Sequence, residues 1–321
     1  MVSGMRPNEK GVLWLKAVRL KRREQSKNLQ LFTLLIPTIV LLIMFCYLPM
    51  FGVVLAFKKY RAVDGIFGSK WNGFKNFEFF FTSQDAGRVL RNTLVLNFSF
   101  IVLGIICAVI FALVMYEVKK PKHVKVYQTV AILPNFLSWV AVGYIVYTLL
   151  EPSRGIINRL LGMVGIDAVN WYSEAAYWPV ILTIVYLWKN VGLNSIIYYA
   201  ALMGVDQDLY EAAELDGATK FQKIWNISIP SIIPVVLVKF VMDMGTIFRA
   251  DFGLFYNVTK NVGRLFETTD VIDTYIYRAL LEQGNIGMSS AVGLFQSVVC
   301  MATLLIVNQI IRKVSPENSL F

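Results

Sequence analysis

Long uninterrupted apolar blocks are the feature that most constrains how this chain can fold. Hydrophobic residues make up 56% of its 321 residues, and they gather in stretches of about 20, the length that a helix needs to cross the hydrocarbon core of a bilayer. A membrane barrel would instead show short alternating segments, and the sequence has none. The sequence therefore predicts an all-α polytopic membrane protein.

Six blocks have the length and composition of transmembrane helices. They cover about 31–56, 93–116, 126–150, 178–201, 232–247 and 291–311. The fifth is the shortest, and Pro230 and Pro234 stand at its start, where a missing backbone donor costs least. We therefore expect a six-helix transmembrane domain over residues 31–311, preceded by a basic segment (1–30) and followed by a short tail (312–321).

Basic residues indicate which ends of the spans face the cytoplasm. The N-terminal segment holds seven lysines and arginines between Lys10 and Lys27, and the loop after the second span holds four lysines between Lys119 and Lys125. Seven basic residues in the loop 58–91 oppose this assignment, but short basic segments next to spans stay in the cytoplasm. We therefore expect both termini of the chain in the cytoplasm.

Residues 12–23 fit either a basic amphipathic helix on the membrane surface or a solvated tail.

The net charge of +10 needs no nucleic-acid partner, because cytoplasmic loops that face anionic lipid account for it. The three cysteines, Cys46, Cys107 and Cys300, lie in apolar blocks and are expected to pack rather than to form disulfides. The single histidine, His123, lies in a basic loop. No metal site is therefore expected.

A polar stretch between the fourth and fifth spans, about 203–230, contains the sequence EAAELDGATKFQKIWNISIP. Its first part is rich in helix formers, and Gly217 interrupts the run. Asp216 is placed to cap a second short helix by accepting from backbone N–H groups near Ala218. The stretch therefore predicts two short helices that meet at a glycine bend. The alternative is an ordinary polar connection between spans.

The surface of these two helices suits a docking element. Ala212 and Ala213 leave a narrow profile that could enter a cleft, and Glu211 can present a negative charge to a basic partner. The second helix carries an apolar stripe that we expect to face the protein itself. This stripe consists of Phe221, Ile224 and Trp225.

The same run resembles the EAA loop in the permease subunits of binding-protein-dependent (type I) ABC importers. The family pattern is Glu-Ala-Ala, three residues, Gly, and an ending similar to Ile-x-Leu-Pro. This chain has Glu211–Ala213, Gly217 and Ile227–Pro230 at those positions, with Ile229 where Leu is common. The substitution is conservative and leaves the pattern intact.

Other parts of the chain resemble permeases of the carbohydrate-uptake family. The stretches 69–81, 88–94 and 271–297 are similar to their first outer loop, their second span and their last loop with the sixth span. The ending ENSLF, Glu317–Phe321, is similar to a subgroup that imports pectin-derived (rhamnogalacturonan) or alginate-derived oligosaccharides. The resemblance therefore covers almost the whole chain.

The resemblance implies the type I ABC-importer permease fold in a bacterial cell membrane. It implies a second homologous permease in a heterodimer, two cytoplasmic ATPases, and an extracellular solute-binding protein that delivers an oligosaccharide. Glu211 would pair with a basic residue of the ATPase, and closure of the ATPase dimer would switch the pathway between its two states. The implied coupling residues are Glu211, Ala212, Ala213, Asp216, Gly217, Ala218, Ile229 and Pro230.

The chain lacks an ATP-binding loop of its own. Such a loop needs Gly-x4-Gly-Lys-Ser/Thr so that backbone donors can wrap a phosphate, and the nearest imitation, GATK at Gly217, lacks the spacing. We therefore expect no catalytic residues and no cofactor on this chain, with ATP and Mg²⁺ bound by the partner ATPase.

Polar and ionisable residues within spans are candidates for the substrate pathway. Lys189 and Asn190 interrupt the fourth span, and Asn194 follows one turn later. For Lys189 and Asn190, a structural role and a substrate role are equally open. Lys239 and Asp243 share one face of the fifth span at i,i+4 spacing. For that pair a structural ion pair is favoured over substrate contact.

Sugar sites combine flat apolar faces for the rings with polar groups for the hydroxyls. Packing is the alternative for each aromatic candidate, because aromatic residues are abundant in this chain. An acidic oligosaccharide would suit Lys189 or Arg249. The aromatic candidates are Tyr144, Tyr147, Trp188, Tyr198 and Phe248.

Two other functions are compatible with a polytopic chain. A transporter driven by an ion gradient would favour inverted repeats and several buried carboxylates, whereas Asp243 is the one acid that we place within a span. A membrane enzyme would need a catalytic cluster at the bilayer edge, which one histidine in a basic loop does not supply.

Overall fold

The structure is a computed structural model that describes residues 32–118 and 120–319. The described residues group into two compact units, one made of 32–55 with 60–69 and the other of 56–59 with 70–319. The basic N-terminal segment, with the amphipathic stretch 12–23 expected in it, lies outside the described residues. The expected domain limits at 30 and 311 therefore stay predictions.

The first unit contains most of the first span, the helix Phe32–Phe57. This helix changes type along its length, through a π-helical turn (Ile43–Tyr47), α2 (Leu48–Met50) and a 3₁₀ segment (Phe51–Phe57). Pro49 explains the change, because it has no backbone N–H and one hydrogen bond of the α-helix is therefore missing. The wider π turn just before Pro49 accommodates this gap in the hydrogen-bond pattern. The short helix α3 (Gly65–Gly68) belongs to the same unit.

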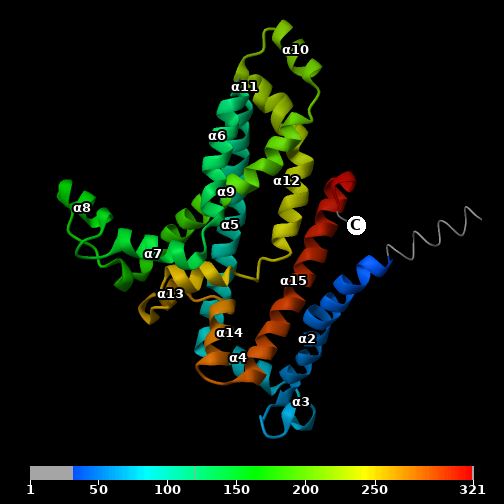
Figure 1. Cartoon of the computed structure of the whole chain (residues 1–321), viewed down its shortest axis with the longest axis vertical. Coiled ribbons are helices and arrows are strands. Elements are labelled where there is room, and N and C mark those ends of the chain that lie inside the picture. The colour runs from blue at the N-terminus through cyan, green and yellow to red at the C-terminus, as the bar shows by residue number, and fades with distance from the viewer. Residues whose placement is uncertain (1–31, 119, 320–321) are drawn as a thin grey trace, which may run out of the picture. The chain divides into compact units, whose positions relative to one another are not determined.

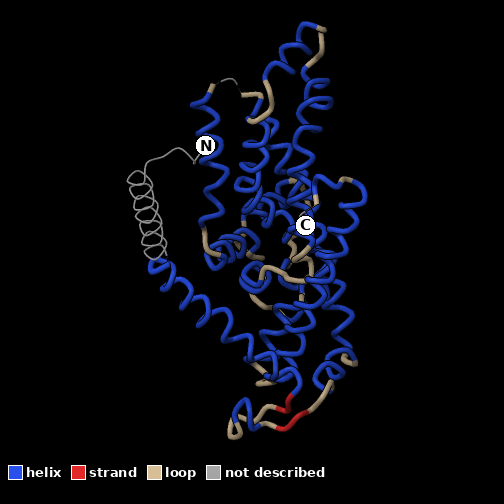
Figure 2. The backbone as a smooth tube through the Cα atoms, turned by 90° about the vertical axis from the view of Figure 1, so that its right-hand side faces the viewer, coloured by secondary structure: helices blue, strands red, loops and turns tan. Residues whose placement is uncertain are grey.

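The second unit is built almost entirely from helices (Figures 1 and 2). Its one sheet within the described residues is the antiparallel pair β1 (Lys58–Lys59) and β2 (Lys70–Trp71), which lies at the opposite end of the unit from α10 (Figure 2). The α-helices are α4 (Lys75–Phe81), α5 (Gln84–Tyr116), α6 (Pro121–Ile132), α7 (Trp139–Leu150), α8 (Ile156–Met163), α9 (Trp178–Met203), α10 (Gln207–Leu215), α11 (Lys220–Lys223), α12 (Ile229–Met244), α13 (Phe266–Thr269), α14 (Ile272–Leu281) and α15 (Ile286–Val314).

Five helices among the described residues are long and apolar enough to cross a membrane. They match the first, second, fourth, fifth and sixth predicted spans. The fifth differs most in its limits, because one continuous helix runs from Lys220 to Met244 and joins α11 to α12 through a π-helical turn (Ile224–Ser228). That turn lies just before Pro230, whose missing N–H it accommodates.

The third predicted span is wrong as a single helix. The segments Pro121–Phe136 and Trp139–Leu150 are bent by 96° at residues 137–138. Pro134 lies in the 3₁₀ turn η3 (Leu133–Phe136), and Leu137 follows with extended backbone. Ser138 then begins α7, because its hydroxyl accepts from the backbone N–H of Ala141 at 3.2 Å. The sequence thus ends one helix and starts another, and we call this junction the bend.

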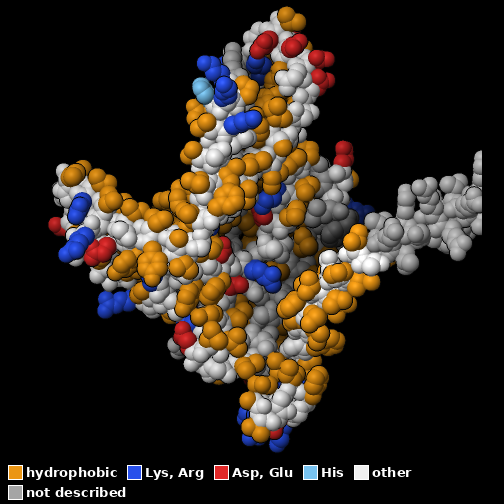
Figure 3. Space-filling view, in the orientation of Figure 1, with side chains coloured by type: hydrophobic (Ala, Val, Ile, Leu, Met, Phe, Trp, Pro, Cys, Tyr) orange, Lys and Arg blue, Asp and Glu red, His pale blue; other side chains and the backbone are white. Residues whose placement is uncertain are grey.

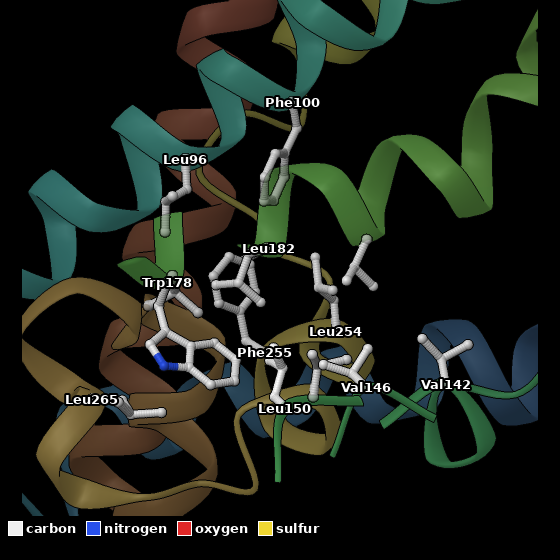
Figure 4. Packing of buried hydrophobic residues seen from close by; sticks show 14 residues of the cluster. Leu96, Phe100, Val142, Val146, Leu150, Trp178, Leu182, Leu254, Phe255 and Leu265 are labelled. Carbon is white, nitrogen blue, oxygen red and sulfur yellow. The ribbon is translucent and has the colours of Figure 1, made fainter. Parts of the chain in front are cut away.

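The largest buried cluster lies where α5, α7 and α9 meet the π-helical turn η7 (Leu254–Val258) (Figure 4). Phe100 of α5 stacks on Tyr186 of α9 with ring centroids 4.5 Å apart. This cluster holds α7 in place beyond the bend. The labelled members in Figure 4 are Leu96, Phe100, Val142, Val146, Leu150, Trp178, Leu182, Leu254, Phe255 and Leu265.

Candidate functional site: an exposed helical turn and a polar cavity

The helix α10 carries the Glu-Ala-Ala motif beyond the ends of α5, α9 and α12 (Figure 1). The helix begins at Asp206, whose carboxylate accepts from the backbone N–H of Asp208 at 3.1 Å. Glu211 and Ala212 are exposed on it, and Ala213 is half-buried. The motif is therefore available for contact with another molecule.

The bend at Gly217 is confirmed. Gly217 has a φ of +75°, which a glycine adopts without the penalty that other residues incur. The backbone N–H of Ala218 donates to the carbonyl of Ala213 at 2.9 Å, and that of Gly217 donates to the carbonyl of Glu214 at 3.0 Å. These two bonds form a Schellman motif, which satisfies the last carbonyls of α10. The α10–α11 turn (residues 207–223) is therefore a defined structure.

The expected capping role of Asp216 is wrong. Asp216 is the C-cap residue that follows α10, whereas Thr219 has the extended backbone that precedes α11. The Thr219 hydroxyl accepts from the N–H of Gln222 at 3.4 Å, and the Gln222 side chain accepts from the N–H of Thr219 at 2.7 Å. This capping box starts α11.

The apolar stripe of the second helix does not face the protein, contrary to expectation. Phe221 and Trp225 are 73% and 62% exposed, and their rings stack on each other at 6.2 Å. Only Ile224 is half-buried. α11 continues directly into the fifth span, and within the described residues the outer face of this helix stays uncovered at Phe221 and Trp225.

Side-chain contacts join the α10–α11 turn to the membrane helices. The Gln207 amide donates to the Tyr116 hydroxyl of α5 at 2.9 Å, and Tyr210 shares a 2.9 Å hydrogen bond with Ser228. Lys223 forms an ion pair with Glu214 across the turn. The turn is therefore tied to the spans by side-chain contacts and by the continuity of α11 with α12.

Charges of opposite sign separate at this end of the unit. Figure 3 shows acidic side chains gathered over α10, and basic side chains with the histidine over the beginning of α6. An acidic surface attracts a basic partner and repels an acidic one. The exposed acids are Asp206, Asp208, Glu211, Glu214 and Asp216.

A polar cavity of about 230 Å³ lies between α5, α9, the end of α12 and the loop that follows α12. Arg249 is exposed there, and no ion-pair partner for it occurs among the described residues. A neighbouring small recess is lined by Asn194 and Tyr198. The residues that line the polar cavity are Asn97, Phe100, Ile101, Tyr186, Asn190, Asp243, Thr246, Arg249 and Asp251.

Lys239 and Asp243 form the ion pair that their spacing predicts. Their side chains are 23% and 28% exposed, and both line the small recess. Asp243 also lines the polar cavity, whereas Lys239 does not. Each charge therefore compensates the other, which supports a structural role for the pair.

Lys189 points away from solvent and into the bend. Its side chain is buried, and Nζ donates to the backbone carbonyls of Pro134, Asn135 and Leu137 at 3.2, 2.8 and 2.6 Å. Its neighbour Asn190 lines the polar cavity and donates to the carbonyl of Tyr186 at 3.0 Å. Of the two adjacent polar residues, only Asn190 is placed to meet a substrate.

The structure separates four aromatic candidates from the polar cavity. Trp188 lines an apolar groove between α5, α6 and α9, and Phe248 packs on a buried cluster around Phe80. Tyr144 and Tyr147 lie on α7, where Lys260 is stacked over the Tyr144 ring at 3.7 Å. Of the predicted pathway residues, the structure thus brings together Asn190 and Arg249 in the cavity, and Asn194 and Tyr198 in the recess.

Several cavity residues were missed by sequence reasoning. Asn97 lies on α5, near the start of the second predicted span, and donates to the carbonyl of Ile247 at 2.7 Å. A polar residue inside an apolar block was a signal that could have found it. Thr246 and Asp251 lie at and just after the end of the fifth span, where the sequence alone does not show that the chain turns back toward α9.

Apolar helices, a polar cavity among them and an exposed helical turn beyond their ends define a membrane permease. The family model described as "Binding-protein-dependent transport system inner membrane component" matches residues 101–316. This chain belongs to that family. It is a multi-pass membrane permease of an ABC importer that works with a solute-binding protein, and it is not an enzyme. The predicted family and fold are thereby confirmed.

Curated and solved relatives agree with this assignment. The chain is 34% identical to protein LplB of Bacillus subtilis over 96% of its own length and 94% of the relative. It is 32% identical to the polygalacturonan/rhamnogalacturonan permease YteP of the same organism, over 90% and 89%. A crystal structure of a bacterial ABC transporter that imports the acidic polysaccharide alginate matches with a TM-score of 0.83 at 33% identity, over 92% and 99%. Nothing in these relationships supports an ion-gradient transporter or a membrane enzyme.

Proposed function

We propose that this chain is one of two homologous permeases in an ATP-driven importer of acidic oligosaccharides. The importer lies in a bacterial cytoplasmic membrane, with both termini of this chain inside the cell. Two cytoplasmic ATPases bind ATP and Mg²⁺ and dock on the α10–α11 turn. An extracellular solute-binding protein delivers the oligosaccharide to the opposite side.

The exposed α10–α11 turn is the observation that carries the coupling step. It presents Glu211 beside small alanines and an uncovered Phe221–Trp225 pair, and it is tied to α5 and to the fifth span. A partner that closes during ATP hydrolysis would pull on a rigid element of this kind and transmit a two-state change to the spans.

The coupling step is tested with the assembled importer in proteoliposomes. Glu211→Gln removes the charge that would meet a basic ATPase residue, so we expect at least a tenfold loss in ATPase affinity, about 1.4 kcal/mol. Glu282→Gln, an exposed acid after α14, is the matched control and should change nothing. A second variant, Phe221→Ser, removes one ring of the uncovered aromatic pair. If the ATPase binds both single variants as tightly as wild type, docking at this turn is refuted.

The acidic substrate class is supported by the cavity and by the relatives. Arg249 faces the polar cavity without an ion-pair partner among the described residues, and a carboxylate-bearing sugar would supply one. The names of the relatives concern polygalacturonan, rhamnogalacturonan and alginate. Asn97, Asn190 and Thr246 offer polar groups for hydroxyls, and Tyr186 offers an aromatic face.

Uptake of labelled oligosaccharides by these proteoliposomes tests the substrate class. Arg249→Ala should slow the uptake of an oligogalacturonate by tenfold or more and should affect a neutral oligosaccharide of equal length far less. Arg159→Ala on α8 is the matched control, because Arg159 is exposed and outside the cavity. Equal losses for both sugars would argue for a packing role of Arg249 and against acid recognition.

A further inference from the structure

Lys189 uses its full donor capacity on the bend. A lysine ammonium has three N–H donors, and the structure gives its Nζ three backbone carbonyl acceptors, those of Pro134, Asn135 and Leu137. The residue is only 6% exposed. No donor is left for a sugar hydroxyl or carboxylate, so the substrate role that the sequence left open for Lys189 lacks a free group.

The bend needs such a donor. The backbone is irregular from Leu133 to Ser138. The carbonyl of Pro134 still accepts from the backbone N–H of Leu137 at 3.2 Å, but no continuing helix supplies donors to the carbonyls of Asn135 and Leu137. Lys189 is buried at this site, so a protein group rather than bulk water supplies the donors. Lys189 reaches this site from α9, more than fifty residues along the chain, and thereby fastens the bend to that helix.

Trp139 extends this link from the bend to the polar cavity. Trp139 is the first residue of α7, and its ring lies 5.0 Å from Lys189 Nζ. Its indole N–H donates to the Asp251 carboxylate at 2.8 Å, and Asp251 lines the polar cavity. A continuous series of contacts therefore runs from α9 through the bend to the cavity wall.

The same α9 leads in the other direction to the α10–α11 turn, which begins four residues after Met203. We propose that Lys189 is a positioning residue that makes the bend and α9 move as one body, so that a displacement of the α10–α11 turn reaches the cavity wall at Trp139 and Asp251. This inference rests on the proposed function, because it needs an ATPase that displaces the turn.

The test compares wild type, Lys189→Met and Lys189→Arg in the reconstituted importer. Lys189→Met keeps the length of the side chain and removes its donors, so the sugar transported per ATP hydrolysed should fall at least tenfold. Lys189→Arg keeps donors and charge, and it should restore this ratio to within about threefold of wild type. Thermal stability of the assembled complex is recorded for each variant to identify a purely folding defect.

A distance measurement distinguishes coupling from simple stability. Spin labels at Val140 and Met203, both exposed and outside the polar cavity, report whether α7 moves with the far end of α9; the native cysteines are first replaced by alanine. In wild type the distance should stay the same without nucleotide and in an ATP-trapped state. In Lys189→Met its distribution should broaden or should differ between the two states.

Each outcome bears on a separate statement. Wild type without ATP-dependent uptake would refute the proposed function itself. Lys189→Met with normal sugar per ATP and an unaltered distance overturns only this inference. A Lys189→Met variant that merely needs more substrate, again with an unaltered distance, also overturns it, in favour of substrate contact. If Lys189→Met does not assemble, the Trp139→Phe variant is measured instead, because phenylalanine lacks the N–H that donates to Asp251. A several-fold loss of sugar transported per ATP supports the link from the bend to the cavity wall. An unchanged ratio of sugar to ATP refutes it.

Discussion

The α10–α11 turn and the bend both interrupt helices, but different parts of the chain stabilise them. At the turn the backbone groups at the interruption find local partners: Ala218 bonds to Ala213, and Thr219 exchanges bonds with Gln222. At the bend the carbonyls of Asn135 and Leu137 receive their donor from Lys189 on another helix. An interruption next to water can rely on nearby residues, whereas an unsatisfied group in hydrocarbon costs several kcal/mol and requires a donor from elsewhere in the fold.

The largest effect should come from the contact that holds α6 on α9 one turn from Lys189. A Cβ on Gly192 would lie 1.9 Å from the carbonyl oxygen of Ala131, and backbone atoms cannot yield as a flexible side chain can. We expect Gly192→Ala to destabilise the protein by about 3 kcal/mol or more. The measurement is the yield of monodisperse protein and its melting temperature in detergent.

Gly293→Ala in α15 is the matched control, because nothing lies within 4 Å of the added Cβ. Alanine is the better helix former, so this variant should be as stable as wild type or slightly more stable. Equal behaviour of the two variants would show that α6 and α9 separate easily, and would remove the basis for treating the bend as fixed to α9.

The sequence predicted the α10–α11 turn better than the bend. The Glu-Ala-Ala motif, Gly217 and their spacing are local, so they identified both helices of the turn. The capping residue was assigned wrongly, to Asp216 instead of Thr219. The exposure of Phe221 was missed because an apolar stripe indicates burial only when a neighbouring helix is there to cover it.

The bend and the cavity depend on contacts between distant parts of the chain. The sequence predicted one span over 126–150, because its composition is apolar throughout and a proline alone does not reveal a 96° change of direction. Lys189 and Asn190 are adjacent in sequence, yet one faces the bend and the other the polar cavity. Only the packing of α9 against its neighbours separates their roles, and no sequence periodicity shows that.

Two ion pairs, one at the polar cavity and one at the α10–α11 turn, allow the next comparison. Lys239 and Asp243 are largely buried beside the polar cavity, whereas Lys223 and Glu214 bridge the α10–α11 turn with Glu214 66% exposed. Removing one partner of a buried pair leaves an uncompensated charge. We expect Lys239→Met to cost about 2 kcal/mol, and Lys223→Met to cost about 0.5 kcal/mol.

Double variants separate the charge effect from packing. Lys239→Met with Asp243→Leu should recover most of the loss, because no unpaired charge remains. The readout is the melting temperature of the purified protein in detergent, measured at low and at high salt. A larger fall in melting temperature for Lys223→Met than for Lys239→Met would show that the cavity pair is hydrated in the membrane. It would also mean that the ion pair at the turn contributes more to stability than the one at the polar cavity.

The other glycine, at the α10–α11 turn, should affect stability far less than Gly192. Nothing lies within 4 Å of a Cβ built on Gly217, so Gly217→Ala meets no clash and differs from Gly192→Ala in that respect. Its φ of +75° alone penalises alanine, by about 1 kcal/mol. We expect the melting temperature of Gly217→Ala to fall by about 2 °C and its spans to insert normally. The loaded binding protein should stimulate ATP hydrolysis less than in wild type, because the relaxed turn would no longer meet the ATPase in one conformation. A melting temperature as low as that of Gly192→Ala would mean that the turn, and not the α6–α9 contact, limits the stability of the fold.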